Sequence, residues 1–463
     1  MRMDKFNASR SVTVIAIVTI TMLAACRTTD KTGNAKGTEQ ADAKVETVSV
    51  DNKIPDSPDE MNENRVPQRQ SERQQTIIRL NDRQREMMML NNRFAFRFMK
   101  AADSKDTGGK GFIYSPLSIT LLMGMINDGA TGETRREIEE ALGFGNNDAE
   151  EVNEYCKTLM EGLPGVDPSV TLNMANAIFV SRKYSLQNSF VQRMENCYSA
   201  SAESLDFESP STLRRINGWC NEKTRGMIPS ILDEIDPTMA SYLLNAIYFK
   251  ADWTDKFDEK DTRDEEFDSP QGKVMVPMMH RSLLTGYAET QTYQAVSIAY
   301  GNGQWSLEVL LPKEGANCAD IIGSLDANGW RSGAEPFLSR YRVDLKLPRF
   351  ETSSDTDESG GLIELMKSLG INLAFDENLA QIPGICNEDP LYIKVMKQKA
   401  RIKVNEKGSE AAAVTVAGMM KVTSAGPREY PTAVFHADHP FVYLIRENSS
   451  GAILFTGKYT GKK

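Results

Sequence analysis

Histidine, cysteine and serine side chains are the groups through which this chain could perform catalysis or hold a metal. The sequence has three histidines, and two of them, His436 and His439, bracket Asp438. Such a pair could bind a metal, but no third ligand is evident, which favours the alternative that both lie in a strand. The Gly-x-Ser-x-Gly elbow, the P-loop and the dinucleotide fingerprint are absent from the sequence. We therefore expect no enzymatic activity, no metal and no cofactor.

Cys26 is the cysteine whose surroundings predict a specific reaction. An apolar run, residues 11–22, follows a basic N-terminus and is too short to span a bilayer comfortably; it ends in Leu23, Ala24, Ala25 and Cys26. The pattern looks like a bacterial lipobox, in which the thiol of Cys26 is diacylglycerated after a signal peptide of residues 1–25 is removed. An ordinary secretory signal is the alternative. Arg27, which follows the cysteine, favours transport to the outer membrane.

The remaining five cysteines predict no disulfide framework. None of them forms a C-x-x-C pair, and an odd number leaves at least one thiol unpaired within the chain. A chain of 463 residues can bury a core large enough to make such crosslinks unnecessary.

Residues 406–420 carry no reactive group but have an unusual pattern. They lack proline and aromatic residues, and the ten residues after Glu410 are uncharged. When the stretch is read with period two, the face that begins at Ser409 holds only small or apolar side chains. Such a segment could enter the middle of a sheet without burying a charge or losing a ladder donor. Composition alone fits an alanine-rich helix or a flexible loop equally well.

The elements that must position these residues predict an α+β domain. Charged residues make up 25% of the chain and its net charge is −10, which argues against a nucleic-acid binder. Capping and periodicity predict helices at residues 87–102, 116–126, 131–142, 211–225 and 362–369. Alternation predicts strands at residues 343–347 and a hairpin that joins residues 296–300 to 305–311.

Several motifs, in order, resemble those of the serpin family. They include residues 114–119 (YSPLSI), 129–134 (GATGET), 173–179 (NMANAIF), 243–253 (LLNAIYFKADW), 344–351 (DLKLPRFE) and 435–445 (FHADHPFVYLI). The resemblance covers about residues 85–463. We take residues 81–463 as a serpin domain and residues 26–80, which are polar, as a flexible tether from Cys26.

The resemblance implies a fold with several helices packed on a large central mixed or antiparallel sheet, smaller sheets, and an exposed reactive-centre loop. It identifies the loop's hinge as Glu406, Gly408, Ser409, Glu410, Ala411, Ala412, Ala413 and Thr415. The family's usual spacing places the reactive bond between Val422 and Thr423, with Lys421 one residue earlier as an alternative and Arg428 as a more distant one.

Further positions transfer to the regions called the shutter and the breach, below and above the sheet opening. These are Ser115, Pro116, Ser118, Asn245, Trp253 and Gln398. Gln398 departs from the family pattern, because many serpins have a histidine at this position. A neutral amide can both donate and accept hydrogen bonds, so Gln398 could replace the histidine. Ordinary core packing is the alternative role for all six residues.

The resemblance implies a suicide inhibitor of serine or cysteine proteases, which traps the acyl-enzyme by inserting the cleaved loop into the central sheet. The alternative is a non-inhibitory serpin that acts as a binding or chaperone-like module. The expected partners are a covalently bound target protease and, through Cys26, a membrane. We expect a monomeric lipoprotein exported to the bacterial outer membrane or cell surface.

Overall fold

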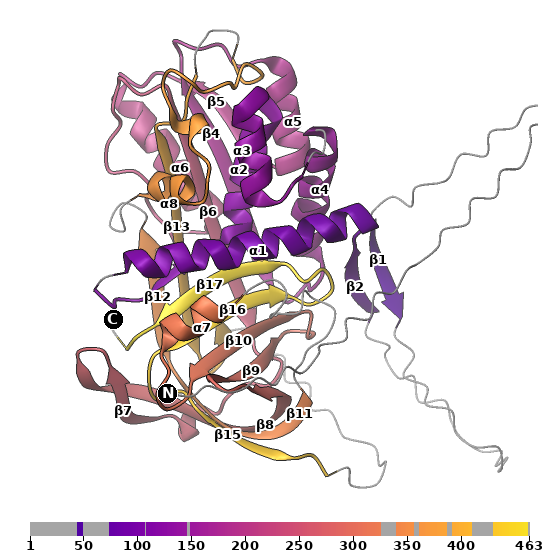
Figure 1. The fold of residues 1–463 in the computed structure, drawn as a ribbon, viewed down its shortest axis with the longest axis vertical. Coiled ribbons are helices and arrows are strands. Elements are labelled where there is room, and N and C mark those ends of the chain that lie inside the picture. Colours follow the sequence, from indigo (N-terminus) through magenta and orange to yellow (C-terminus); the bar gives the residue numbers. More distant parts are fainter. Residues whose placement is uncertain are drawn as a thin grey trace, which may run out of the picture. The chain divides into compact units, whose positions relative to one another are not determined.

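The computed structural model describes residues 44–49, 74–106, 108–145, 149–325, 339–355, 361–386, 391–409 and 429–461. All of them belong to the compact unit Asp42–Lys463 (Figure 1). The predicted signal peptide and Cys26 lie outside the described residues, as does the chain from Glu410 to Arg428.

The helices begin and end where capping residues dictate. The α-helices are α1 (Asp82–Lys105), α2 (Pro116–Gly129), α3 (Gly132–Leu142), α4 (Ala149–Gly162), α5 (Asn188–Tyr198), α6 (Pro210–Lys223), α7 (Cys318–Ser324) and α8 (Leu362–Ser368). Short 3-10 turns lie at η1 (Leu163–Gly165), η2 (Glu259–Asp261) and η3 (Leu373–Phe375). Ser115 caps α2 and the left-handed Gly143 ends α3, as the sequence predicts. α1 starts earlier than predicted, because Asn81 and Gln84 form a capping box.

The strands are more numerous than alternation alone predicts. They are β1 (Lys44–Ser49), β2 (Gln74–Arg79), β3 (Phe112–Tyr114), β4 (Thr171–Ser181), β5 (Ser201–Leu205), β6 (Ser241–Asp252), β7 (Arg263–Ser269), β8 (Gly272–Glu289), β9 (Tyr293–Tyr300), β10 (Trp305–Pro312), β11 (Ser339–Pro348), β12 (Phe350–Asp355), β13 (Val395–Asn405), β14 (Gly408–Ser409), β15 (Thr432–His436), β16 (Phe441–Glu447) and β17 (Ile453–Tyr459). The predicted β9–β10 hairpin is confirmed.

Two large sheets organise the domain. Among the described residues, one sheet has nine strands in the order β15-β11-β8-β9-β10-β16-β17-β3, with β7 paired to β8. The other has six, in the order β12-β13-β14-β6-β4-β5. β13 runs parallel to β6, β6 runs antiparallel to β4, and β4 runs parallel to β5. The predicted α+β architecture with a mixed central sheet is therefore confirmed.

Two strands of the six-stranded sheet, β4 and β6, are buried on both faces. α2 packs against β4 and β6 on one face, where Leu243 and Ile247 join the main core. α6 packs against the same two strands on the other face, where its Trp219 joins Leu244 and Ala246 in a second, smaller core. A strand that enters next to β13 must therefore suit the main core on one face and partly exposed side chains on the other, because only alternate residues of β13 are buried.

Two paired strands lie within the residues expected to form the tether. Within residues 26–80, β1 and β2 pair antiparallel over six residues each, from Lys44 opposite Arg79 to Ser49 opposite Gln74. Ile78 and Leu80 are buried, and Ile78 donates its N–H to Ser449 Oγ at 3.0 Å. The overall polarity of the segment concealed the β-branched and apolar residues that anchor β2 to the domain. None of the described helices is long and apolar enough to cross a membrane.

Candidate functional site

The site centres on β14, which separates β13 from β6 at one end of the six-stranded sheet. β13 ends at Asn405, the chain turns through Glu406 and Lys407, and β14 runs back antiparallel to both neighbours. Ser409 lies opposite Val404 on β13 and Ala251 on β6. The first two residues of the segment after the turn are therefore already part of the sheet.

A glycine is required where β14 begins. Gly408 has a φ of +151°, and a Cβ built on it would lie 2.0 Å from the Ala251 carbonyl oxygen. That distance is far inside van der Waals contact, so no larger residue fits without displacing the backbone of β6. The resemblance implies that Gly408 belongs to the hinge, and this close approach to β6 requires a glycine at the same position.

Trp253 holds the turn before β14. Its indole Nε1 donates to the Asn405 carbonyl at 2.8 Å, and its backbone N–H donates to the Lys407 carbonyl at 2.8 Å. Its ring stacks on Tyr300 with centroids 4.3 Å apart and planes within 10°. The Tyr300 hydroxyl is 2.6 Å from Ser409 Oγ, in a fully buried contact.

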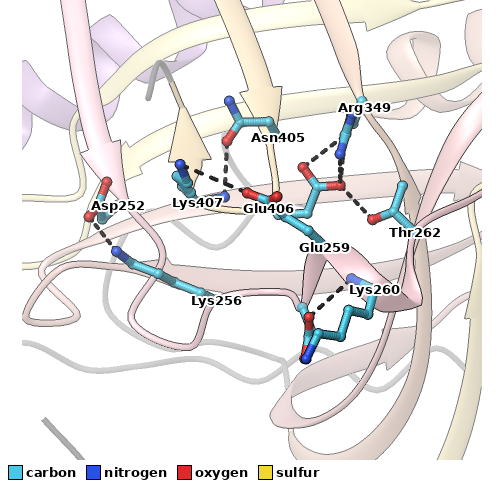
Figure 2. Close-up of polar contacts among 10 residues, drawn as sticks. Asp252, Lys256, Glu259, Lys260, Thr262, Arg349, Asn405, Glu406 and Lys407 are labelled. Atoms are coloured by element: carbon cyan, nitrogen blue, oxygen red, sulfur yellow. Dashed lines mark hydrogen bonds and ion pairs between the residues drawn. The ribbon is translucent and has the colours of Figure 1, made fainter. Parts of the chain in front are cut away.

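Glu406 anchors the same turn from the other side. Arg349 Nε donates to both of its carboxylate oxygens, at 2.6 and 2.8 Å, and Thr262 Oγ1 donates to Oε1 (Figure 2). The Phe257 N–H donates to the Glu406 carbonyl at 3.0 Å. Burial opposes ionisation of Glu406, but the hydrogen bonds from Arg349 and Thr262 outweigh it, so its pKa is lowered.

β13 and β6 meet differently along their length. From Val395 to Lys399, β13 pairs directly with Tyr242 to Ala246 of β6, and we call this part the paired half. Around β14 the same strands are held apart, and we call residues 400–405 of β13 and 247–252 of β6 the wedged half. Residues 400–403 of β13 and 247–250 of β6 pair neither with each other nor with the two residues of β14.

Gln398 closes the paired half. Its Oε1 accepts the Ser115 N–H at 2.9 Å, and its Nε2 donates to the Ser115 carbonyl and to Asn245 Oδ1, both at 3.1 Å. Ser115, Asn245 and Gln398 are all fully buried. Asn245 Nδ2 in turn donates to Asn176 Oδ1 on β4 at 2.9 Å. One amide therefore ties β13, β6 and the start of α2 together.

The described residues bring the predicted positions together in two groups. Ser115, Pro116, Ser118, Asn245 and Gln398 meet in the paired half, where Ser115 Oγ accepts the Ser118 N–H at 3.3 Å. Glu406, Gly408, Ser409 and Trp253 meet in the wedged half. Glu410, Ala411, Ala412, Ala413, Thr415, Lys421, Val422 and Thr423 lie outside the described residues.

Sequence reasoning missed three side chains of the site: Thr262, Tyr300 and Arg349. Thr262 and Arg349 lie 144 and 57 residues from Glu406, and Tyr300 lies 109 residues from Ser409. No local periodicity connects positions so far apart. Arg349 and Tyr300 do lie in or beside motifs that were noted, but the sequence did not indicate which way they point.

The reactive side chains outside this site are occupied by structural contacts. His436 Nε2 lies 3.2 Å from Asp344 Oδ2, while His439 contacts Asp438 Oδ1 at 2.7 Å and the Pro312 carbonyl at 2.9 Å. Within the described residues, no group of three or more His, Cys, Asp or Glu side chains could hold a metal.

Burial also lowers the reactivity of three cysteine thiols. Among the described residues, Cys156, Cys197, Cys220 and Cys318 are free, and Cys156, Cys220, Cys318 and Cys386 are buried. Burial raises the pKa of Cys156, Cys220 and Cys318 to about 12. These three thiols are therefore protonated at neutral pH and are poor nucleophiles.

Comparisons with known proteins agree with this geometry. Residues 89–461 match the family model described as serpin (serine protease inhibitor). Human leukocyte elastase inhibitor is 31% identical over 80% of this chain and 98% of its own length, and a serpin-like protein of Thermococcus kodakarensis is 32% identical over 76% and 80%. The native state of tengpin, a thermophilic serpin, superposes with a TM-score of 0.71 at 26% identity over 83% of this chain and 95% of its own. Human thyroxine-binding globulin superposes with a TM-score of 0.71 at 27% identity, over 81% of this chain and 98% of its own.

Proposed function

Because the chain belongs to the serpin family, we propose that it is a suicide inhibitor that traps serine or cysteine proteases by inserting its cleaved loop into the six-stranded sheet. The observation that carries the proposal is the position of β14. Its two residues already separate β13 from β6, in antiparallel register with both strands. A strand that lengthened from Ser409 would grow directly into the space between them.

The register of β14 determines which residues of an inserted strand would face the main core. If that register continued, Ala411 would lie between Ile402 and Phe249, and Thr415 would lie between Gln398 and Asn245. All four of these neighbours are buried, as is Ser409. The segment has small side chains at these alternating positions, so it fits without burying a charge or overfilling the core.

On the opposite face of the inserted strand, the charges of the segment and of its two neighbouring strands would be complementary. Glu410 would lie between Lys250 and Lys403, one from each neighbouring strand. Lys403 is exposed and Lys250 is half-buried, so the carboxylate would gain two cationic neighbours at the edge of solvent. The first added residue therefore suits the outer surface of the sheet, and the second suits its core.

The chemistry belongs to the protease. Its serine or cysteine attacks the carbonyl carbon of Val422, the bond to the nitrogen of Thr423 breaks, and the new amine leaves with the C-terminal fragment. The protease stays linked to Val422 as an ester or thioester. Insertion then pulls the enzyme away, and a misplacement of about 1 Å costs roughly 10²-fold in rate, so water no longer releases it.

Incubation with elastase-like, trypsin-like and papain-like proteases tests this function. We expect an SDS-resistant band of inhibitor plus protease, and mass spectrometry of the released peptide distinguishes cleavage after Val422 from cleavage after Lys421. A protein that is cleaved without forming this band, and whose melting temperature does not rise on cleavage, would instead be a non-inhibitory serpin that binds a partner.

The N-terminus supports a proposal about location. We propose that the thiol of Cys26 carries the lipid that holds the inhibitor, as a monomer, on the bacterial surface. Several acyl chains, each stabilised by ~0.8 kcal/mol per buried CH₂, give stable attachment, whereas one does not. Cys26→Ser should abolish labelling by a fatty-acid analogue and release the protein from the membrane fraction. Unchanged fractionation and labelling would contradict the proposal.

A further inference from the structure

The buried hydroxyl pair of Tyr300 and Ser409 is the part of the site that neither the family match nor the loop chemistry explains. The oxygen atoms are 2.6 Å apart, and both residues have no exposed surface. Tyr300 comes from the end of β9 in the nine-stranded sheet, whereas Ser409 is the second residue of β14 in the six-stranded sheet. One hydrogen bond thus connects the two sheets at the hinge.

The ring of Tyr300 is fixed before it meets Ser409. It stacks on Trp253 with centroids 4.3 Å apart, and it packs edge-on against Phe249 of β6 with centroids 5.5 Å apart. Burial raises the pKa of Tyr300, so the phenol keeps its proton throughout the physiological range. The hydroxyl is therefore held at one position as a neutral group.

Ser409 cannot leave this position gradually. Neither residue has solvent-exposed surface, so a small displacement of β14 would leave both hydroxyls without a partner. Full withdrawal of β14 instead exposes Ser409 to solvent, where its hydroxyl is satisfied again. The contact therefore favours two discrete states, with β14 either seated or withdrawn.

We propose that Tyr300 is a positioning residue that fixes the resting depth of the hinge, by holding Ser409 in the sheet before any protease arrives. This inference rests on the proposed function. Insertion after cleavage then extends an existing strand, and the costly step of starting a new one has already taken place. Since insertion competes with hydrolysis of the acyl-enzyme, the contact, which we call the hinge latch, favours trapping over release.

Three variants separate the latch from plain packing. Tyr300→Phe keeps the ring and its stack on Trp253 and removes only the hydroxyl, while Ser409→Ala removes the partner. The double variant shows whether the two effects share one cause. Tyr443→Phe is the matched control, because Tyr443 is equally buried on β16 and its hydroxyl is not part of the contact with Ser409.

Hydrogen exchange of the free inhibitor tests the resting position without any protease. We expect the amides of Gly408 and Ser409 to exchange about tenfold faster in Tyr300→Phe and Ser409→Ala, since the loss of one buried hydrogen bond corresponds to about one order of magnitude. The double variant should exchange no faster than either single one, and Tyr443→Phe should match the wild type. Unchanged exchange at these two amides in Tyr300→Phe overturns the latch.

The stoichiometry of inhibition tests what the latch does. With a protease that the wild type traps, more molecules of the Tyr300→Phe inhibitor should be consumed per enzyme inactivated. The number for Tyr443→Phe should equal that for the wild type. Faster exchange with an unchanged stoichiometry overturns the claim that the seated hinge favours trapping. A wild type that forms no covalent band defeats the proposed function instead, while the exchange measurement still decides whether the latch exists.

Discussion

The wedged half and the paired half use the same two strands in opposite ways. In the wedged half, β13 and β6 are separated by β14, and the contacts that fix the turn before it come from Trp253 and Arg349. In the paired half, the strands hydrogen-bond to each other and Gln398 closes the junction. One end of the sheet is therefore already open, so resistance to an incoming strand is concentrated in the buried polar contacts of the other end.

Thr415→Arg should have the largest effect on this contrast. In the register of β14, residue 415 reaches the paired half between the buried Gln398 and Asn245. An unpaired charge buried there costs about 4 kcal/mol, enough to stop the strand before it passes the shutter. The variant should become a substrate, with a stoichiometry of inhibition raised more than tenfold in a titration against protease.

Thr415→Ala is the control, since it keeps a small side chain at the same position and should inhibit like the wild type. Ala411→Pro, which removes a ladder donor in the wedged half, should also produce a substrate. If Thr415→Arg trapped protease at the wild-type stoichiometry, insertion would have to stop short of the paired half.

Gln398→Leu should weaken the paired half by about 3 kcal/mol, because it leaves buried groups of Ser115 and Asn245 without partners. We expect the first urea transition of the uncleaved protein to move to lower denaturant. Gln294→Leu, at a half-buried position on β9, is the control and should change this midpoint little. An equal loss in both variants would mean that Gln398 has no special part in holding the sheet shut.

Gly408→Ala should unseat β14 at a cost of about 2 kcal/mol, since its Cβ would meet the Ala251 carbonyl oxygen at 2.0 Å. The amide of Ser409 should then exchange faster while the Gln398 amide stays protected, which would separate the two halves experimentally. Gly165→Ala serves as the control, because a Cβ there meets nothing within 4 Å. Fast exchange at both places would show that the halves open together.

Glu406→Gln should have the smallest of these effects, about 1.5 kcal/mol at neutral pH. The hydrogen bonds from Arg349 and Thr262 outweigh burial and lower the pKa of Glu406 from its ordinary value of 4.5. The contribution of this carboxylate is therefore complete above that value and is lost as the pH falls through the lower folded pKa. The difference in urea midpoint between wild type and variant should be constant from pH 8 to pH 5 and shrink in more acidic buffer.

Glu351→Gln provides the matched ion pair. Glu351 pairs with Arg401, and both side chains are about as exposed as that of Arg349, whereas the side chain of Glu406 is only 4% exposed. Removal of Glu351 should change the free energy of unfolding, measured by urea titration, by less than about 0.5 kcal/mol. A larger effect there than at Glu406 would remove the reason to assign the turn's rigidity to the buried carboxylate.

Local rules predicted much of the fold. Ser115 and Pro116 mark the start of α2, Gly143 marks the end of α3, and the alternation of residues 343–347 marks β11. Each signal lies within a few residues of the feature that it determines, so capping and periodicity suffice. The family motifs supplied the rest of the architecture.

The depth of the hinge could not be predicted in this way. The two-residue periodicity of residues 409–420 indicated which face suits a core. The position of Ser409 in the sheet, however, depends on its contact with Tyr300, whose ring stacks on Trp253. Those contacts arise only after two sheets have packed together. β1 was missed for a related reason, because its partner β2 lies beyond an intervening polar stretch that dominates the local composition.

The placement of two indoles has an optical consequence. Trp253 stacks on Tyr300 beside β14, while Trp219 on α6 meets Phe179 of β4 edge-on, with centroids 5.7 Å apart, in the smaller core over the paired strands. Emission from an indole changes when its stacking partner or hydrogen bond changes. Each end of the sheet therefore carries its own intrinsic fluorophore, and single-tryptophan forms of the chain would time the passage of a strand from one end to the other without an added dye.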